Sequence, residues 1–270
     1  MSNVNVYATS HVISKTICES FAPGCNGRVV PAVTLLDGDV ACYGILRGTH
    51  EILVQAQKEN RDWYYIDLGY IGRSDHYHLK FDGYYRVSKK AYQCQGLGDY
   101  SSERWENLGI SLQPWRRGGS HVLICPMSYN FSIHRGLDAK KWLNDTIAEV
   151  SRYTDRNILV KPKSSDMTLD EALMDCHAMI GYDTNAMVDA IIAGIPCFNL
   201  GPSAVAPVAL QDLKQIESPV YPDRRQWAYN IAANQWTLNE FRNGTCWRML
   251  QENADNNTPL VQRKRQRNVQ

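Results

Sequence analysis

Basic and polar side chains follow two apolar runs in the second half of the chain. Lys161 and Lys163 follow the first run, and Thr184 and Asn185 follow the run Ala178–Gly181. Short apolar runs of this kind are typical of buried parallel strands. A turn from such a strand into a helix presents unpaired amides and the positive end of the helix dipole. The spacing therefore predicts a site for an anion, most often a phosphate, with a simple N-cap at Thr184 as the alternative.

The elements that must hold these residues alternate between helix and strand. Gly194 is expected to end the helix that begins after Asn185. The periodicity and turn residues predict, in order, a strand His121–Cys125, a helix Ala139–Tyr153, a helix Leu169–His177, the strand Ala178–Gly181, a helix Ala186–Ala193, a strand Ile195–Leu200, and helices Arg224–Ala233 and Leu238–Leu250.

The first half has the same alternation, followed by a long aromatic stretch. The predicted elements are a strand Asn5–Ala8, a helix over Val12–Phe21, extended runs Val29–Leu36 and Val40–Leu46, a helix Thr49–Lys58, a strand Trp63–Ile66 and a short strand Tyr85–Val87. Alternating strands and helices predict parallel sheets with both faces covered. We therefore expect an α/β protein made of two Rossmann-like domains that face one another across a cleft.

A boundary between the domains is expected near residue 118. The segment Arg116-Arg117-Gly118-Gly119 looks like a hinge, because a new apolar strand starts directly after it. The expected domains are residues 1–118 and residues 119–252, and the second ends in terminal crossing helices. Residues 253–270 form a polar, basic tail that is expected to be disordered.

The pattern Gly181-x-x-Thr184-Asn185, continued by Gly194-x-Pro196, resembles the donor half of GT-B glycosyltransferases. More narrowly, the chain from Cys42 to Trp247 resembles bacteriophage glycosyltransferases that act on 5-hydroxymethylpyrimidine bases of DNA. The segments that carry this likeness are Trp63–Asp67, Tyr84–Val87, Arg104–Gly109, Pro114-Trp115, Pro222–Trp227 and Gln235–Thr237.

The resemblance implies a sugar-nucleotide donor, with UDP-glucose as the expected UDP-sugar. The donor would be held by residues 119–252 and the acceptor by residues 1–118. The resemblance implies no permanently bound cofactor and no metal. The residues expected to bind the donor are Lys161, Lys163, Thr184, Asn185, Asp189 and Gly194.

Asp67 is the expected catalytic base. An inverting transfer of a sugar to an alcohol needs a group that takes the hydroxyl proton. Asp67 follows the strand Trp63–Ile66 at its carboxyl end, and the resembling proteins also have an aspartate there. The alternative is that Asp67 braces the following turn. Asp37 and His50 are weaker candidates, and Asp183 lies too close to the proposed phosphates.

The implied acceptor is a hydroxymethylated pyrimidine in double-stranded DNA. An enzyme that modifies a base inside a duplex has to flip that base out. The residues expected to contact DNA are Arg47, Tyr70, Arg86, Arg116 and Arg117. Surface salt bridges are the alternative for the arginines, and burial in the core is the alternative for the tyrosine.

Composition excludes several other classes of protein. The 270 residues carry a formal net charge of +1, which argues against a histone-like coating protein. The chain has no apolar segment near its amino end that is long enough for a signal peptide or a membrane span. A cytoplasmic location in the infected host is therefore expected. The eight cysteines form no CxxC pair and are expected to be reduced core residues.

Motifs of other enzyme classes are missing from the chain. The sequence has no GxGxxG, no GxxxxGK[ST] and no GxSxG, which disfavours a nicotinamide enzyme, a P-loop NTPase and a serine hydrolase. Two alternatives stay open. One is a GT-B transferase or epimerase that acts on a polysaccharide or a free sugar nucleotide, and the other is a binder of nucleotides or nucleic acid without catalysis.

Overall fold

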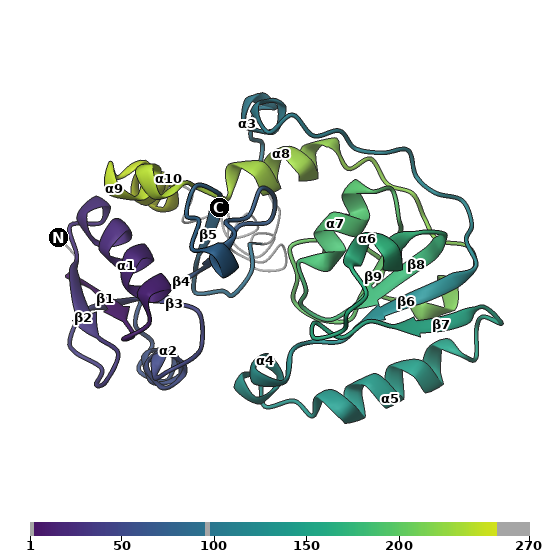
Figure 1. Cartoon of the computed structure of the whole chain (residues 1–270), viewed down its shortest axis with the longest axis horizontal. Coiled ribbons are helices and arrows are strands. Elements are labelled where there is room, and N and C mark those ends of the chain that lie inside the picture. The colour runs from purple at the N-terminus through teal and green to yellow at the C-terminus, as the bar shows by residue number, and fades with distance from the viewer. Residues whose placement is uncertain (1–2, 95–97, 253–270) are drawn as a thin grey trace, which may run out of the picture. The chain divides into compact units, whose positions relative to one another are not determined.

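Two β-sheets organise the chain, one in each of two units (Figure 1). The computed structural model describes residues 3–94 and 98–252. The first unit contains the described residues up to Gly98 and those from Ala232 onward, and the second unit contains Asp99–Ile231. Each unit alternates strands and helices around a mainly parallel sheet, so the prediction of two Rossmann-like domains is confirmed.

The first unit has a five-stranded sheet in the order β2-β1-β3-β4-β5. All neighbouring strands are parallel except β5, which runs antiparallel to β4. The elements are β1 (Val4–Ala8), α1 (Val12–Gly24), β2 (Arg28–Pro31), β3 (Asp39–Tyr43), α2 (Thr49–Lys58), β4 (Trp63–Leu68), η1 (His76–His78) and β5 (Tyr85–Lys89).

Alternation along the strands gives this sheet two apolar faces. Val4 and Val6 of β1 point into a cluster formed with α1, α9 (Leu238–Arg242) and α10 (Thr245–Glu252). The opposite face is covered by α2, whose Leu53 is fully buried. Because successive side chains of a strand point to opposite faces, one residue pattern supplies both layers.

The C-terminal segment returns to the first unit through backbone and side-chain hydrogen bonds. Trp236 and Tyr85 exchange two backbone bonds of 2.7 Å, and the Gln235 side-chain oxygen accepts from the backbone N–H groups of Tyr70 and Ile71. The expected helix Leu238–Leu250 is divided into α9 and α10 at Gly244, which has φ +79°. The terminal helices are therefore part of the first unit's core.

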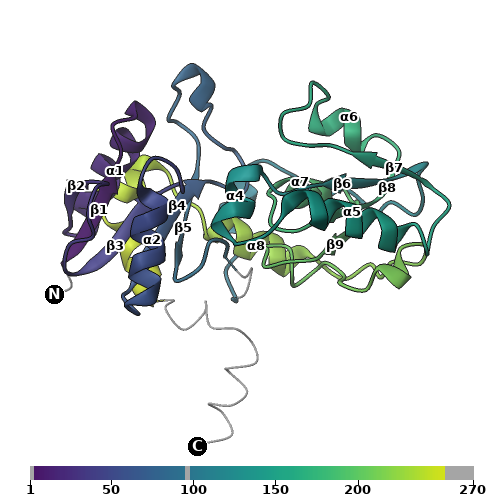
Figure 2. The same ribbon diagram turned by 90° about the horizontal axis from the view of Figure 1, so that it is seen from below.

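The second unit has a parallel four-stranded sheet in the order β7-β6-β8-β9. Figures 1 and 2 show α5 on one face of this sheet and α6 and α7 on the other. The elements are α3 (Glu103–Asn107), β6 (His121–Cys125), α4 (Tyr129–His134), α5 (Ala139–Val150), β7 (Asn157–Val160), α6 (Leu169–Leu173), β8 (Cys176–Gly181), α7 (Ala186–Ile192), β9 (Cys197–Asn199), η2 (Leu213–Gln215) and α8 (Arg225–Ala233).

The predicted helix Leu169–His177 is wrong in its second half. The helix α6 ends at Leu173, and Asp175 takes a left-handed conformation with φ +51°. Cys176 and His177 then enter β8, where both are buried. Pairing of β8 with β6 places these residues in a strand, although their spacing along the sequence is that of a helix.

The division between the units differs from the expected boundary near residue 118. The backbone N–H of Gln113 donates to Ile192 (2.9 Å), and that of Arg116 donates to Gly194 (2.6 Å). The segment expected to be a hinge is therefore bound to the second unit, which begins at Asp99. The expected tail, residues 253–270, lies outside the described residues.

All eight cysteines are free and buried, which confirms the expectation of reduced core thiols. Burial raises the pKa of Cys18 to about 12 and that of Cys176 to about 11. The thiolate is the form that reacts with a disulfide reagent. We therefore expect almost none of the eight thiols to react in the native protein at pH 8, and all eight to react once the protein is unfolded in guanidinium. Absorbance of the released reagent measures both numbers, and fast reaction of a native thiol would contradict this packing.

In the part of the chain that the structure describes, no helix has both the length and the apolar character that a membrane crossing needs.

Candidate active site

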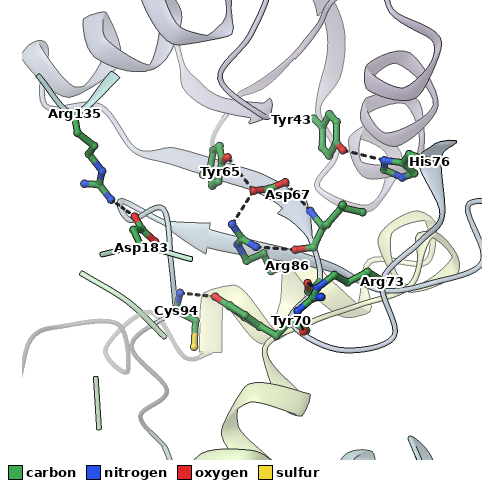
Figure 3. Close-up of polar contacts among 12 residues, drawn as sticks. Tyr43, Tyr65, Asp67, Tyr70, Arg73, His76, Arg86, Cys94, Arg135 and Asp183 are labelled. Atoms are coloured by element: carbon green, nitrogen blue, oxygen red, sulfur yellow. Dashed lines mark hydrogen bonds and ion pairs between the residues drawn. The ribbon is translucent and has the colours of Figure 1, made fainter. Parts of the chain in front are cut away.

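Asp67 lies near the end of β4, with both carboxylate oxygens bound by donors of the same unit (Figure 3). The Arg86 guanidinium lies 2.7 Å from Oδ2, and the Tyr65 hydroxyl donates to the same oxygen over 3.1 Å. Oδ1 accepts the backbone N–H of Leu68 at 2.8 Å. The Asp67 side chain keeps 31% of its surface exposed, so the carboxylate is fixed in direction and still accessible.

Arg86 and Tyr70 support this carboxylate from the interior. Arg86 is only 4% exposed, donates to the Leu68 carbonyl at 2.8 Å, and lies 5.3 Å from the Tyr70 ring centroid. Tyr70 is fully buried, and its hydroxyl accepts the backbone N–H of Cys94. Buried side chains do not present a surface to DNA, so the structure gives Arg86 and Tyr70 a supporting role in place of the expected DNA contacts.

His76 lies beside this group, and Figure 3 shows its contact with Tyr43. Its Nδ1 is 3.1 Å from the Tyr43 hydroxyl, and its Nε2 is 2.9 Å from the Tyr85 hydroxyl. Burial lowers the pKa of His76 from its usual 6.5, and the charge of Asp67 opposes this shift. Burial also raises the pKa of Tyr43. The ring is therefore neutral at pH 7, with one nitrogen donating and the other accepting.

The neutral state of His76 predicts a pH dependence of stability. Because the pKa in the folded protein lies below that of the unfolded chain, the unfolded chain binds more protons at pH values between the two. The contribution of neutral His76 to the free energy of unfolding should be fully present above pH 6.5. It should be lost as the pH falls through the pKa of His76 in the folded protein. Urea titrations at pH 5.5 and 7.5 measure this difference. We expect His76→Gln to reduce it, and an unchanged difference would contradict the assignment.

In the second unit, the loops after β6 and β8 leave the adjacent strands toward opposite faces of the sheet. Such a switch point is where parallel α/β sheets usually bind ligands. The loop after β6 contains α4, and Arg135 at its end forms an ion pair of 2.8 Å with Asp183 of the loop after β8. The Asp183 side chain is completely buried. This ion pair connects the two loops. The arginine also balances the negative charge of Asp183, which the sequence places too close to the proposed phosphates.

The lysines expected to bind the donor follow β7 at the same edge of the sheet. Lys161 is half-buried, its backbone N–H donates to Ile124 (2.9 Å), and its ammonium is 3.4 Å from the Ser165 hydroxyl. Its charge partly opposes the burial that raises the pKa of Cys125 to about 12. Lys161 is thus near the end of β6, whereas Lys163 is exposed.

Thr184 and Asn185 form the turn into α7. The Thr184 hydroxyl accepts the backbone N–H of Ala186 at 3.2 Å, and both turn residues are half-buried. Asp189 lies in the first turn of α7 and is also half-buried. The hydroxyl of Thr184 therefore serves the turn itself. The N-cap of α7 is Asn185, which makes no side-chain capping bond, so the alternative of an N-cap at Thr184 is not what the structure has. Binding of a donor by Thr184, Asn185 or Asp189 stays a prediction.

Gly194 has a different role from the expected donor contact. It ends α7 with φ +83°, its N–H donates to Ile191, and its carbonyl accepts the N–H of Arg116. A Cβ atom at this position would lie 2.1 Å from the Pro114 carbonyl oxygen. The backbone of Gly194 is covered by the segment around Pro114, so we assign this glycine to packing.

Two of the three other arginines expected to contact DNA are engaged within the second unit. The Arg116 guanidinium donates to the carbonyls of Leu173 (2.6 Å) and Cys176 (3.2 Å). Arg117 lies 4.7 Å from the Tyr221 ring centroid. Arg47 belongs to the first unit, where it is exposed just before α2.

Sequence reasoning missed the supporting residues Tyr43, His76 and Arg135. Arg224 is buried, binds the carbonyls of Ile191 and Gln113, and lies 3.9 Å from the Trp115 ring centroid. Nothing in their spacing pairs Arg135 with Asp183, which is 48 residues away. Among the described residues, no three His, Cys, Asp or Glu side chains lie close enough together to hold a metal ion.

Comparison with known proteins identifies the architecture. No family model and no curated protein matches the chain. Among solved structures, the Thermosulfurimonas dismutans KpsC beta Kdo 2,7 transferase aligns with a TM-score of 0.54 at 11% identity, covering 92% of this chain and 99% of that chain. The KpsC beta Kdo 2,4 transferase of the same organism gives 0.53 at 12% identity, covering 84% and 89%. The fold is of the GT-B glycosyltransferase type. This confirms the expected fold class, while identities this low show the fold alone.

Proposed function

We propose that the chain is a glycosyltransferase that moves a sugar from a nucleotide diphosphate sugar, with UDP-glucose as the expected donor. The acceptor is the hydroxymethyl group of a modified pyrimidine in phage DNA. The observation that carries the proposal is the Asp67 carboxylate at the carboxyl end of β4, which is held on both oxygens and stays about one-third exposed.

Asp67 would take the proton of the acceptor hydroxyl while that oxygen attacks the anomeric carbon. A positioned base must lie within hydrogen-bond reach of the proton that it removes. The bonds from Arg86 and Leu68 fix the direction of the carboxylate, which favours such positioning. The basic ligand of the leaving diphosphate would be Lys161 at the carboxyl end of β7, because positive charge stabilises the negative charge that develops there.

The DNA acceptor is supported by the sequence resemblance and by Arg47. Among the expected arginines, Arg47 is the exposed one that makes no hydrogen bond, ion pair or ring contact within the described residues. Carbohydrate is the alternative acceptor, because both similar structures are named as transferases of Kdo. A binder without catalysis is the third possibility, since a GT-B-type fold by itself does not establish turnover.

Mass spectrometry of digested DNA separates these functions. Purified full-length protein is incubated with UDP-glucose and a duplex that contains 5-hydroxymethylcytosine, 5-hydroxymethyluracil or only ordinary bases. We expect a nucleoside heavier by one hexosyl unit with a hydroxymethylated duplex and none with the ordinary duplex. Hydrolysis of several sugar nucleotides without any heavier nucleoside would point to another acceptor. Absence of both transfer and hydrolysis, with binding retained, would favour the binder.

A further inference from the structure

A pocket of about 570 Å³ opens in the first unit at the carboxyl ends of β1 and β2, apart from the Asp67 cluster. We call it the β1–β2 pocket. Its walls are the ends of both strands with the residues that follow them, Lys15 of α1, and Arg47. A volume of this size lies in the range of small-ligand sites, about 300–1,000 Å³. The pocket therefore has room for a ligand of nucleotide size.

The charged residues that line the β1–β2 pocket are both basic. Within residues 3–94 and 98–252, Arg47 makes no side-chain hydrogen bond or ion pair. Lys15 makes one exposed contact of 3.8 Å with Glu19, and exposed pairs of this kind contribute little, about 0–1 kcal/mol. The pocket thus holds two positive charges with almost no compensation from the protein.

Backbone donors add to this charge. The helix α1 has 13 residues, its N-cap His11 makes no side-chain capping bond, and its first turn has no acidic residue. Ser10 lines the pocket just before this helix and is exposed. Free amides and the helix dipole favour an anion at such an end. The dipole therefore acts in the same direction as Lys15 and Arg47.

The remaining wall of the pocket is apolar. Val29 is 40% exposed and Val33 is 81% exposed, and both line the pocket. Apolar side chains left open beside two cations suit a ligand that joins an anionic group to a sugar or base ring. Phosphate contacts from arginine, lysine and helix ends are the usual way in which proteins hold a nucleic-acid strand in register.

We propose that the β1–β2 pocket binds a phosphate of the DNA strand that carries the acceptor base. The pocket and Asp67 lie at the same carboxyl edge of the sheet, and β1 is two strand spacings, about 10 Å, from β4. Neighbouring nucleotides of one strand can span this distance. The choice of DNA as the source of the phosphate rests on the proposed function, whereas the anion site rests on the pocket alone.

Calorimetric titration of the full chain with a trinucleotide tests the proposal. The trinucleotide carries 5-hydroxymethyldeoxycytidine in the centre, with either two phosphodiester linkages or two neutral methylphosphonate linkages. We expect the neutral form to bind about tenfold more weakly, as loss of a charge-assisted contact predicts. Arg47→Met should weaken the diester by the same factor and leave the neutral form unchanged. The slope of log affinity against log salt should fall by about 0.7 for one lost phosphate contact.

Two further variants control this experiment. Arg152→Met removes an exposed arginine of the second unit, 68% exposed, and should not change binding. Val33→Glu places a negative charge in the pocket at a surface position, so it should weaken the diester without unfolding the protein. Equal binding of the two trinucleotides, or equal effects of Arg47→Met and Arg152→Met, would overturn the proposal. Inorganic phosphate that competes as well as the trinucleotide would overturn the assignment to a strand.

The failure of this proposal can be distinguished from failure of the proposed function. Binding that depends on Arg47 and on the phosphate charge, without transfer of a sugar, leaves the pocket assignment standing and removes the catalytic one. Transfer to hydroxymethylated DNA with an affinity that Arg47→Met does not change removes the pocket assignment alone.

Discussion

Asp67→Asn should lower the rate of sugar transfer about 10³-fold, within the range of 10²–10⁴ that general base catalysis contributes. The asparagine keeps the size of the side chain, and its carbonyl oxygen can still accept from Arg86. The amide is not basic at neutral pH, so no side chain at this position can take the proton from the hydroxyl group that receives the sugar. The transfer rate at saturating donor and acceptor measures the effect.

The control for this variant is Asp62→Asn. Asp62 comes directly before the same strand and also forms ion pairs, with Lys89 and Lys90, but at the opposite edge of the sheet. It should leave the transfer rate within about twofold, because Asp62 lies away from the proposed reaction and ion pairs near the surface contribute little. Equal loss in both variants would indicate damage to β4. Full activity of Asp67→Asn would exclude Asp67 as the base.

Gly194→Ala should lower the free energy of unfolding by about 3 kcal/mol. An L-residue at φ +83° costs about 1–2 kcal/mol, and crowding of a packed site costs about 1–3 kcal/mol. The added Cβ would meet the Pro114 carbonyl at 2.1 Å, so the segment held on α7 must move. Urea unfolding followed by tryptophan fluorescence measures the change.

Gly136→Ala separates the two causes. Gly136 has φ +66°, and a Cβ there would meet no atom within 4 Å. Its substitution should cost only the conformational part, about 1–2 kcal/mol. Similar losses for Gly136→Ala and Gly194→Ala would contradict the close packing of Pro114 against α7.

Local patterns in the sequence predict most strands of the fold because buried strands need apolar runs. The runs at β4, β6 and β8 are short and mainly apolar, and each becomes a strand. The carboxyl ends of parallel strands then bring Asp67 and Lys161 to sheet edges without any further information. The general position of these two residues is therefore readable from the sequence.

Residues that act through distant partners could not be predicted in this way. Arginine and tyrosine are residue types that often contact nucleic acid, yet Arg86 and Tyr70 are buried. Asp67 pairs with the Arg86 guanidinium, and the backbone N–H of Cys94 donates to the Tyr70 hydroxyl. Gly194 has the same local signature whether it binds a phosphate or ends a helix. The difference arises from Pro114, which lies 80 positions earlier in the chain. Only tertiary contacts decide such cases.

The division of the chain has the same cause. The glycines at 118–119 have the composition of a hinge, but hydrogen bonds from Gln113 and Arg116 hold the preceding segment to the second unit. The terminal helices belong to the first unit through Trp236, which pairs with Tyr85 some 151 positions away. The amino-acid composition of a segment indicates how flexible it is in isolation. These hydrogen bonds depend on distant residues that only the folded structure brings close to the segment.

A crystal structure of the protein soaked with UDP-glucose tests the central claim most directly. We predict the diphosphate at the carboxyl edge of the second sheet, within hydrogen-bond reach of Lys161 and of the turn Thr184-Asn185. Nucleotide density at any other place, or Lys161 turned away from an occupied edge, would contradict it.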